Sequence, residues 1–208
     1  MDDLVIRGMA KWPNVPAVYG WLTLDRRGAW LIKSEKISNP TVNAFIGRNY
    51  AHDQRGRWYF QNGPQRVYVT LEYTPFVYRL DAGIDRVLDL EAHNGQRARA
   101  IAAAFIDEGG AVLLQTDIGI GIVHDKDLEI VRKALVDFDG SRLRDDELGK
   151  RVHAMQRAEE AALYLHLGRA RQPVVVQAIR SVDVPRRFGF DANPCDDTTD
   201  AAARSANV

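Results

Sequence analysis

A short run of histidine and acidic residues near the middle of the chain is the first place where chemistry could occur. Residues 124–127 read His-Asp-Lys-Asp, and imidazole and carboxylate groups are suitable ligands for zinc, manganese or iron. With Asp117, the side chains of His124 and Asp127 could serve a metal-assisted hydrolase. However, no second histidine cluster lies at a recognised metal-site spacing, and acidic residues are also typical of a helix N-terminus. We therefore favour a structural role for this run and expect no metal site.

A second candidate is the apolar run 117–123, in which glycine alternates with isoleucine. As a strand it would place its isoleucines on one face, and Asp117, Gly119 and Gly121 on the other. Glycines in a strand mark the close approach of another group, which is more often a packed side chain or helix than a ligand. The third glycine of a dinucleotide-binding fingerprint is absent, because His124 stands in its place, and this excludes a Rossmann site.

The loop 61–66 is rich in amide side chains and lies beside aromatic residues. Amides and an arginine can hold a small polar ligand next to a ring, although the same residue types also form ordinary hairpin turns. A nucleic-acid surface of arginines and aromatics is disfavoured by the neutral charge of the chain. The residues that we consider as ligand-binding candidates are Asp117, Gly119, Gly121, Gln61, Asn62 and Arg66.

Other catalytic signatures are absent from the sequence. The remaining histidines are dispersed, the serines lack a Gly-x-Ser-x-Gly elbow, and no Gly-x-x-x-x-Gly-Lys phosphate loop occurs. The single cysteine, Cys195, falls in a predicted tail, so a nucleophilic role is disfavoured. We expect no catalytic residues and no cofactor, and we lean towards a protein that is not an enzyme.

Charge and cysteine content limit the partners and the compartment. The 208 residues include 28 basic and 28 acidic side chains, and the net charge of +0 argues against nucleic acid or a membrane surface as partner. A single cysteine cannot form an intrachain disulfide, which favours a reducing compartment, the cytoplasm. No apolar run approaches the ~20 residues of a bilayer span, and residues 4–6 are too few for a signal peptide. Met9 is an alternative start to Met1.

The residue patterns predict an α+β fold with mostly antiparallel strands. All four tryptophans lie in the first third of the chain, so the N-terminal half should be β-rich with a large aromatic core or surface. Asn39-Pro40 should open a helix, and Asn62-Gly63 is typical of a hairpin. The alanine-rich segment 97–106 is predicted as a helix. An apolar stripe predicts a long helix near the C-terminus, over residues 145–168.

One turn pattern recurs along the chain. Asp-x-x-Gly occurs at 25–28, 53–56 and 107–110, and in the first two copies a tryptophan follows two residues later. The aspartate side chain can accept hydrogen bonds from amides inside such a turn, and glycine supplies the positive φ that ends it. We therefore predict repeated helix–turn–strand units, with an aspartate-lined functional site as the alternative.

The domain organisation follows from composition. Residues 1–11 are predicted as an N-terminal extension and residues 12–190 as a single α+β domain, for which two subdomains, 12–90 and 91–190, are the alternative. Residues 191–208 are small and acidic, which predicts a disordered tail.

Two segments carry a resemblance to known proteins. They are Trp-Leu-Thr-Leu-Asp-Arg-Arg-Gly-Ala-Trp at 21–30 and Gly-Arg-Trp-Tyr-Phe-Gln-Asn-Gly-Pro-Gln-Arg-Val-Tyr-Val at 56–69. With Thr-Pro-Phe at 74–76 they resemble an uncharacterised proteobacterial conserved-protein family, and their order is similar, more distantly, to the domain-of-unknown-function family DUF1285. The match covers about residues 12–125, although Gln-Asn-Gly at 61–63 replaces the usual Thr-Pro pair. The resemblance implies an α+β fold with repeated motifs and a role in ligand sensing or signalling.

These observations lead to one functional expectation and two alternatives. We expect a non-enzymatic ligand-binding or regulatory module whose partner is an unknown small molecule or protein. The first alternative is the metal-assisted hydrolase described above. The second is a protein-interaction module that acts through helix 145–168, with a homodimer as one outcome.

Overall fold

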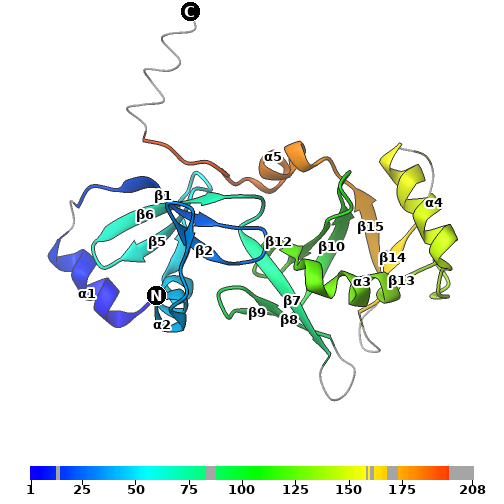
Figure 1. Cartoon of the computed structure of the whole chain (residues 1–208), viewed down its shortest axis with the longest axis horizontal. Helices are drawn as coiled ribbons and strands as arrows, with labels where there is room; N and C mark the ends of the chain where they lie inside the picture. Colours follow the sequence, from blue (N-terminus) through cyan, green and yellow to red (C-terminus); the bar gives the residue numbers. More distant parts are fainter. Residues whose placement is uncertain (13–14, 83–87, 158, 160–161, 168–172, 197–208) are drawn as a thin grey trace, which may run out of the picture. The chain divides into compact units, whose positions relative to one another are not determined.

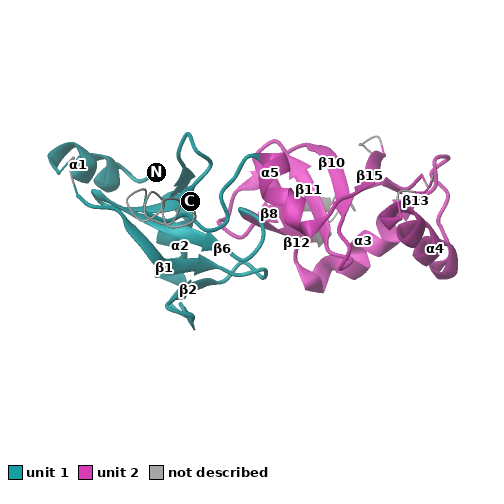
Figure 2. Ribbon diagram, turned by 90° about the horizontal axis from the view of Figure 1, so that it is seen from above, with its two compact units in different colours: residues 1–75, 189–208 teal, residues 76–188 magenta. Residues whose placement is uncertain are grey.

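The chain divides into two compact units, each with its own β-sheet (Figure 2). Unit 1 comprises residues 1–75 and 189–208, and unit 2 comprises residues 76–188. The computed structural model describes residues 1–12, 15–82, 88–157, 159, 162–167 and 173–196. Part of the tail predicted from residue 191 lies outside these described residues. The predicted class, α+β with mostly antiparallel strands, is confirmed, because most of the strand pairs in both sheets are antiparallel.

In its described residues, unit 1 consists of a six-stranded sheet and two helices (Figure 1). The strand order is β3-β2-β1-β6-β5-β4, and the β1–β6 pair is parallel. Its core is aromatic as predicted, for example where the Trp30 and Tyr50 rings meet edge to face with centroids 5.2 Å apart. Its elements are α1 (Asp3–Lys11), β1 (Val18–Leu24), β2 (Trp30–Ile32), β3 (Glu35–Lys36), α2 (Pro40–Arg48), β4 (Tyr50–His52), β5 (Trp58–Asn62) and β6 (Gln65–Leu71).

Helix α2 begins where the sequence predicts. Asn39 is its N-cap, and the Asn39 side-chain oxygen accepts hydrogen bonds from the amides of Thr41 and Val42 at 2.9 and 3.3 Å. Pro40 occupies the first turn, where a missing N–H costs nothing. The helix packs on β5 through Phe45, whose ring lies edge to face with that of Phe60 at 5.5 Å. These contacts hold α2 against the face of the sheet at β5.

Unit 2 is a nine-stranded sheet in the order β13-β14-β15-β10-β11-β12-β7-β8-β9. Its centre is apolar, since Leu113, Leu114 and Ala104 are fully buried. Its strands are β7 (Phe76–Ala82), β8 (Leu88–Ala92), β9 (Arg97–Ala98), β10 (Ile101–Ile106), β11 (Val112–Thr116), β12 (Gly119–Val123), β13 (Leu135–Val136), β14 (Tyr164–Leu165) and β15 (Val174–Ala178). Its helices are η1 (Asp125–Asp127), α3 (Leu128–Ala134), α4 (Asp145–Gln156), η2 (Ser181–Asp183) and α5 (Val184–Phe188).

The helix predicted over 97–106 is wrong, because this segment forms strands β9 and β10. Strand β10 lies between β11 and β15, with Ala104, Phe105 and Ile106 buried. The alanines favoured a helix by intrinsic propensity, but pairing on both sides in the sheet outweighs a preference of less than about 1 kcal/mol per residue.

The long helix predicted over 145–168 is also shorter than expected. Helix α4 begins at Asp145 and ends at Gln156, and α5 near the C-terminus has only five residues. Beyond α4 the buried leucines Leu163, Leu165 and Leu167 recur at every second residue, which is the period of a strand, and β14 forms there. Met155 of α4 is buried, and the Gln156 amide donates to Asp107 O at 3.0 Å. The apolar stripe of α4 therefore packs on the sheet of its own unit.

The repeated Asp-x-x-Gly pattern forms β-hairpin turns, because a strand and not a helix precedes each copy. The Asp25 amide donates to Ala29 O at 3.0 Å, and the Gly28 amide donates to Asp25 O at 3.1 Å. Asp25 Oδ1 accepts from the amides of Arg27 and Ala29 at 2.9 and 2.7 Å. The copies at 53–56 and 107–110 repeat these bonds, with glycine φ angles of 75° and 80°. The pattern is thus a tight turn with a left-handed glycine, and the aspartates are structural.

A fourth copy of this turn went unrecognised in the sequence. In segment 137–140 the Gly140 amide donates to Asp137 O at 2.9 Å, and Gly140 has φ of 81°. Here the Asp137 carboxylate also binds Arg151 of α4, with Arg151 Nη2 at 2.6 Å from Oδ2. The turn therefore attaches α4 to the end of β13.

Among the helices of the described residues, none has the length and apolar composition that a bilayer crossing requires.

Candidate functional site

A groove of about 530 Å³ opens on one face of the unit 1 sheet, beside helix α2. Its walls come from β1, β2, β5, β6 and α2, and most of the lining side chains are apolar. The strand register explains the apolar floor: Leu22 lies opposite Ile32, and Phe60 lies opposite Val67, so that these side chains share one face. Its volume lies within the range of about 300–1,000 Å³ that is typical of small-molecule sites.

A β-bulge in β1 directs a tryptophan into this groove. Between Val18 and Leu22 the ladder to β6 shifts register, so that three residues of β1 lie opposite one residue of β6. Gly20, within the bulge, has φ of 70°, a conformation that glycine adopts at little cost. As a result the adjacent residues Trp21 and Leu22 both line the groove, although neighbours in a regular strand point to opposite faces.

Three large apolar side chains at the groove remain unusually exposed. The exposed fractions are 50% for Trp21, 46% for Ile32 and 40% for Val42. They come from a strand, a hairpin end and a helix that converge on one groove. A clustered apolar surface of this kind is characteristic of a binding site, whereas scattered exposed residues are ordinary.

Two amide side chains supply the polar groups of the groove lining. Asn62, at the end of β5, is exposed, and Gln65 begins β6 across the hairpin. Gln65 Nε2 donates to Pro16 O at 3.2 Å, which fixes the side chain in place. Asn62 is therefore the candidate from the loop 61–66 that lines the groove, and its amide can donate or accept a hydrogen bond.

Gln61 and Arg66 lie on the opposite face of the same hairpin, because they pair across the strands one position away from the groove-lining residues. Gln61 is 1% exposed, and its Nε2 donates to Gly63 O at 2.9 Å. The Arg66 guanidinium lies over the Tyr59 ring, 4.6 Å from the ring centroid. The two residues contribute to packing and cation–π contact there, and the structure does not bring them together with Asn62.

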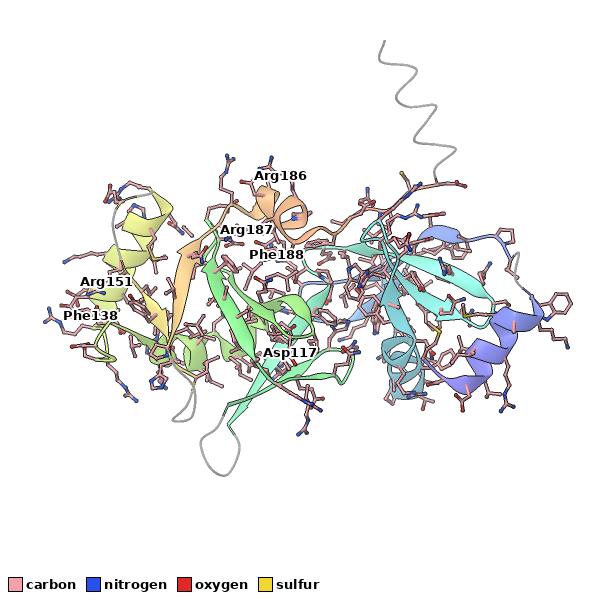
Figure 3. The ribbon with its side chains drawn as sticks, turned by 180° about the vertical axis from the view of Figure 1, so that it is seen from behind. Asp117, Phe138, Arg151, Arg186, Arg187 and Phe188 are labelled. Atoms are coloured by element: carbon pink, nitrogen blue, oxygen red, sulfur yellow. The ribbon has the colours of Figure 1, made fainter. Side chains whose placement is uncertain are left out.

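Asp117 lies in unit 2, at the turn between β11 and β12 (Figure 3). Its Oδ1 accepts hydrogen bonds from the amides of Arg99 and Ala100 at 2.8 and 3.2 Å. The bond from the Ala100 amide, with that from Arg99, lowers the pKa of the Asp117 carboxyl below its usual range. The carboxylate thus holds the backbone of residues 99–100 against the turn. The other predicted candidates, Gln61, Asn62 and Arg66, belong to unit 1, so Asp117 is not placed in a common site with them.

The glycines of β12 are covered by aromatic rings. A Cβ at Gly121 would lie 2.5 Å from Cε2 of Tyr78, and a Cβ at Gly119 would lie 2.8 Å from Cε2 of Phe76. The Tyr78 hydroxyl donates to Gly119 O at 2.9 Å, which holds its ring across the strand. The close approach that the glycines indicate is therefore made by the side chains of the neighbouring strand β7.

The three residues of the hydrolase hypothesis do not form one site. Asp117 precedes strand β12 and His124 follows it, so the length of the strand, about 13 Å at about 3.3 Å per residue, separates them. His124 Nδ1 accepts from the Lys126 amide at 3.1 Å, so His124 caps η1, and burial lowers its pKa. Asp127 is 4% exposed and binds Arg79 Nε at 2.6 Å and the Leu80 amide at 3.0 Å.

In the part of the chain that the structure describes, no group of three histidine, cysteine, aspartate or glutamate side chains could hold a metal ion. The segment 124–127 is therefore an attachment point between η1 and β7. The geometry gives the metal-assisted hydrolase no assembled site.

Sequence reasoning missed most of the groove. Trp21, Ile32 and Val42 were not among the candidate residues, because an exposed apolar side chain looks the same in sequence as a buried one. One signal could have found the groove: Gly20 followed by the adjacent apolar pair Trp21-Leu22 breaks strand alternation, which is typical of a bulge.

The fold and the groove together define a two-unit α+β protein with a candidate ligand-binding site in its first unit. The chain belongs to the family DUF2944, described as "Protein of unknown function (DUF2946)", whose model matches residues 1–195.

Two crystal structures of DUF1285 family proteins are similar to the chain. The first, from Silicibacter pomeroyi DSS-3, has a TM-score of 0.47 at 17% identity and covers 72% of this chain and 99% of its own. The second, from Shewanella baltica OS155, has a TM-score of 0.40 at 13% identity and covers 53% of this chain and 88% of its own. No curated protein matches the chain. The predicted resemblance to an uncharacterised family that is distantly similar to DUF1285 is thereby confirmed.

Proposed function

We propose that unit 1 is a non-enzymatic ligand-binding module that holds the apolar part of a small molecule in the groove beside α2. The observation that carries the proposal is the convergence of Trp21, Ile32 and Val42, each at least 40% exposed, on a groove of about 530 Å³. Covering apolar surface is worth about 25 cal/mol per Å², so a ligand that buries these three side chains gains much of its affinity from them.

The arrangement of polar groups supports a small molecule as the occupant. The groove has an apolar floor and wall, with two amide side chains at the hairpin end, Asn62 and Gln65. This combination, a largely apolar lining with a few placed polar groups, is what small-molecule sites use for affinity and orientation. A regulatory role in the cytoplasm, as the sequence suggests, is part of the proposal.

The proposal is tested with a neutral hydrophobic fluorescent probe, N-phenyl-1-naphthylamine, and with 1-decanol as its competitor. We expect the full chain to bind the probe, 1-decanol to displace it, and 1-decanol to raise the melting temperature, because a ligand of the native state stabilises it. Val42→Asp should weaken the binding of the probe and of 1-decanol by about tenfold or more, since it places a charge in an apolar groove. The helix should tolerate this change, because acidic residues are favourable in a first turn.

Ala44→Asp is the matched control. Ala44 is exposed on the same helix, and two residues of offset place it about 200° around the helix from Val42. It should bind the probe as the unmodified chain does. Equal binding by Val42→Asp, or no binding by the unmodified chain, would remove the proposal. Sedimentation of the two variants and the unmodified chain shows whether a second copy of the chain occupies the groove instead, which would also overturn it.

A further inference from the structure

A lysine lies over the ring of a tryptophan that lines the groove. Lys33 directly follows Ile32, which lines the groove, and its Nζ lies 3.9 Å from the centroid of the Trp21 ring. Because Trp21 is itself part of the lining, the ammonium group contacts a side chain that a ligand in the groove would also contact. A cation over an indole face is held by the ring quadrupole, so this position is favoured before any ligand binds.

The backbone also fixes Lys33 in an uncommon conformation. Lys33 and Ser34 have φ angles of 48° and 71°, and they are the two residues outside glycine with positive φ among the described residues. They join β2 to β3 in a two-residue turn, a place where Asn-Gly is the usual choice, and the left-handed conformation costs a residue with a side chain about 1–2 kcal/mol. The Lys33 amide donates to Trp21 O at 3.0 Å, which ties the turn to the bulge.

Lys33 takes part in no ion pair within the described part of the chain, and the groove lining contains no acidic side chain. An apolar groove with a cation over one of its lining rings is complementary to a molecule with an apolar body and an anionic end.

We propose that the ligand of the groove is a single anionic amphiphile, a free fatty-acid-like carboxylate, whose chain lies in the groove and whose carboxylate binds Lys33. The inference rests on the proposed function and adds the chemical class of the ligand. A single molecule fits better than a bilayer surface for two reasons. The groove is bounded by a sheet floor and by α2 on one side, whereas bilayer recognition usually takes clusters of four or more basic residues, and here one lysine lies over a lining ring.

The experiment compares decanoate with 1-decanol, which has the same chain without the charge, on the full chain at neutral pH. Lys33→Gln should weaken decanoate binding about fivefold, the worth of a partly exposed ion pair, and leave 1-decanol binding unchanged. Raising the salt concentration should lower the affinity for decanoate in the unmodified chain but not in Lys33→Gln. Lys36→Gln is the control, because Lys36 is an exposed lysine on the adjacent strand β3 that does not line the groove.

The outcomes separate the two proposals. If 1-decanol binds but Lys33→Gln leaves decanoate affinity unchanged, the anionic head group is wrong and the groove stands. If neither compound binds, the proposed function fails and the head-group inference falls with it. If the chain binds phosphatidylglycerol vesicles but neither free compound, a bilayer is the occupant and the proposal is overturned. Lys33→Arg should restore decanoate binding, since the charge returns.

Discussion

His93, a half-buried residue of unit 2, shows how its surroundings control the chemistry of one side chain. The His93 amide donates to Val77 O at 2.8 Å, and His93 Nδ1 accepts from the Val77 amide at 3.3 Å. The ring lies beside that of Phe76, and burial lowers the pKa of the imidazole from 6.5 to about 3. The folded chain therefore keeps His93 neutral under conditions in which the unfolded chain protonates it.

This pKa difference predicts a loss of stability in mild acid. Above pH 6.5 both states hold a neutral imidazole, and the full contribution is present. Between pH 6.5 and about 3 the unfolded chain binds a proton that the folded chain does not, so the free energy of unfolding falls by at most about 1.4 kcal/mol per pH unit. His93→Asn, whose side-chain oxygen can replace Nδ1 as the acceptor, should flatten this decline when urea unfolding of unit 2 is followed from neutral pH to pH 5.

Two comparisons make the result specific to His93. His153→Asn changes an exposed histidine of α4 and is the control for removing a histidine outside the His93 site. His124 also has a lowered pKa through burial, so part of the acid dependence should persist in His93→Asn. An unaltered profile in His93→Asn would show that the imidazole of His93 is protonated equally in both states.

At the scale of elements, the Asp-x-x-Gly hairpin turn is the most repeated device of the chain. At the turn between β10 and β11, Asp107 is 2% exposed, and its Oδ1 accepts from the amides of Gly109 and Ala111 at 2.9 and 2.8 Å. Both strands lie in the middle of the nine-stranded sheet. The side-chain oxygen therefore satisfies backbone donors at the turn between two central strands, where unpaired amides would destabilise the sheet.

Substitution of Asp107 tests whether the turn needs the oxygen or the charge. Asp107→Ala removes the acceptor of two amides and should cost about 1–2 kcal/mol of stability, whereas Asp107→Asn keeps a side-chain oxygen at the same place and should recover most of it. Hydrogen exchange at the Gly109 and Ala111 amides gives a local measurement, with fast exchange expected only in Asp107→Ala. Equal loss in both variants would mean that the negative charge of Asp107 is the essential feature.

The sequence predicted the turns better than it predicted the elements between them. A turn such as 53–56 depends on side-chain chemistry within five residues, and such chemistry is visible in sequence. The segment 97–106 depends on its neighbours: it is a strand because β11 and β15 pair with it. Helix α4 ended early for a reason that was visible, since the period-two leucines at 163–167 are typical of a strand.

Of the residues that line the groove, Asn62 is the one that the sequence predicted as a ligand-binding candidate. The reason is that the groove is a property of how β1, β2 and α2 come together, and none of its apolar residues has a distinctive local pattern. The glycine run 117–123 did indicate close approach, but the approaching groups, the rings of Phe76 and Tyr78, come from β7 about 40 residues earlier. Long-range pairing of this kind cannot be read from one sequence.

At the scale of the whole molecule, unit 1 is completed by the part of the chain that follows unit 2. Residues 189–196 return to the unit 1 sheet, where the Asp191 amide donates to Gly56 O at 3.1 Å and the Leu71 amide donates to Ala192 O at 2.8 Å. Phe190 is 8% exposed. A Cβ at Gly56 would lie 2.1 Å from Gly189 O, so glycine is required there both for its φ of 75° and for this approach.

This return predicts that the end of the chain is part of the fold of unit 1. A chain ending at Phe188 loses two backbone hydrogen bonds and exposes the surface that Phe190 covers, whereas a chain ending at Asp196 keeps both. We expect the melting temperature of unit 1 to fall by about 10 °C or more in the shorter chain, because the loss of a buried phenylalanine alone costs about 3 kcal/mol or more. Near-ultraviolet circular dichroism, which reports the aromatic core around Trp30 and Tyr50, gives the measurement.

The chain ending at Asp196 is the matched control, and it should melt as the full chain does. Unit 2 provides a second control, because residues 76–188 form one continuous stretch with its own core and are present in both shortened chains. Its transition should not move. If both shortened chains melt at the same temperature, residues 189–196 merely lie on unit 1 and do not stabilise it. If the melting temperature of unit 1 falls as expected, the affinity of the groove for the probe should fall as well. The reason is that β1 and β6, which line the groove, belong to the same sheet as Leu71.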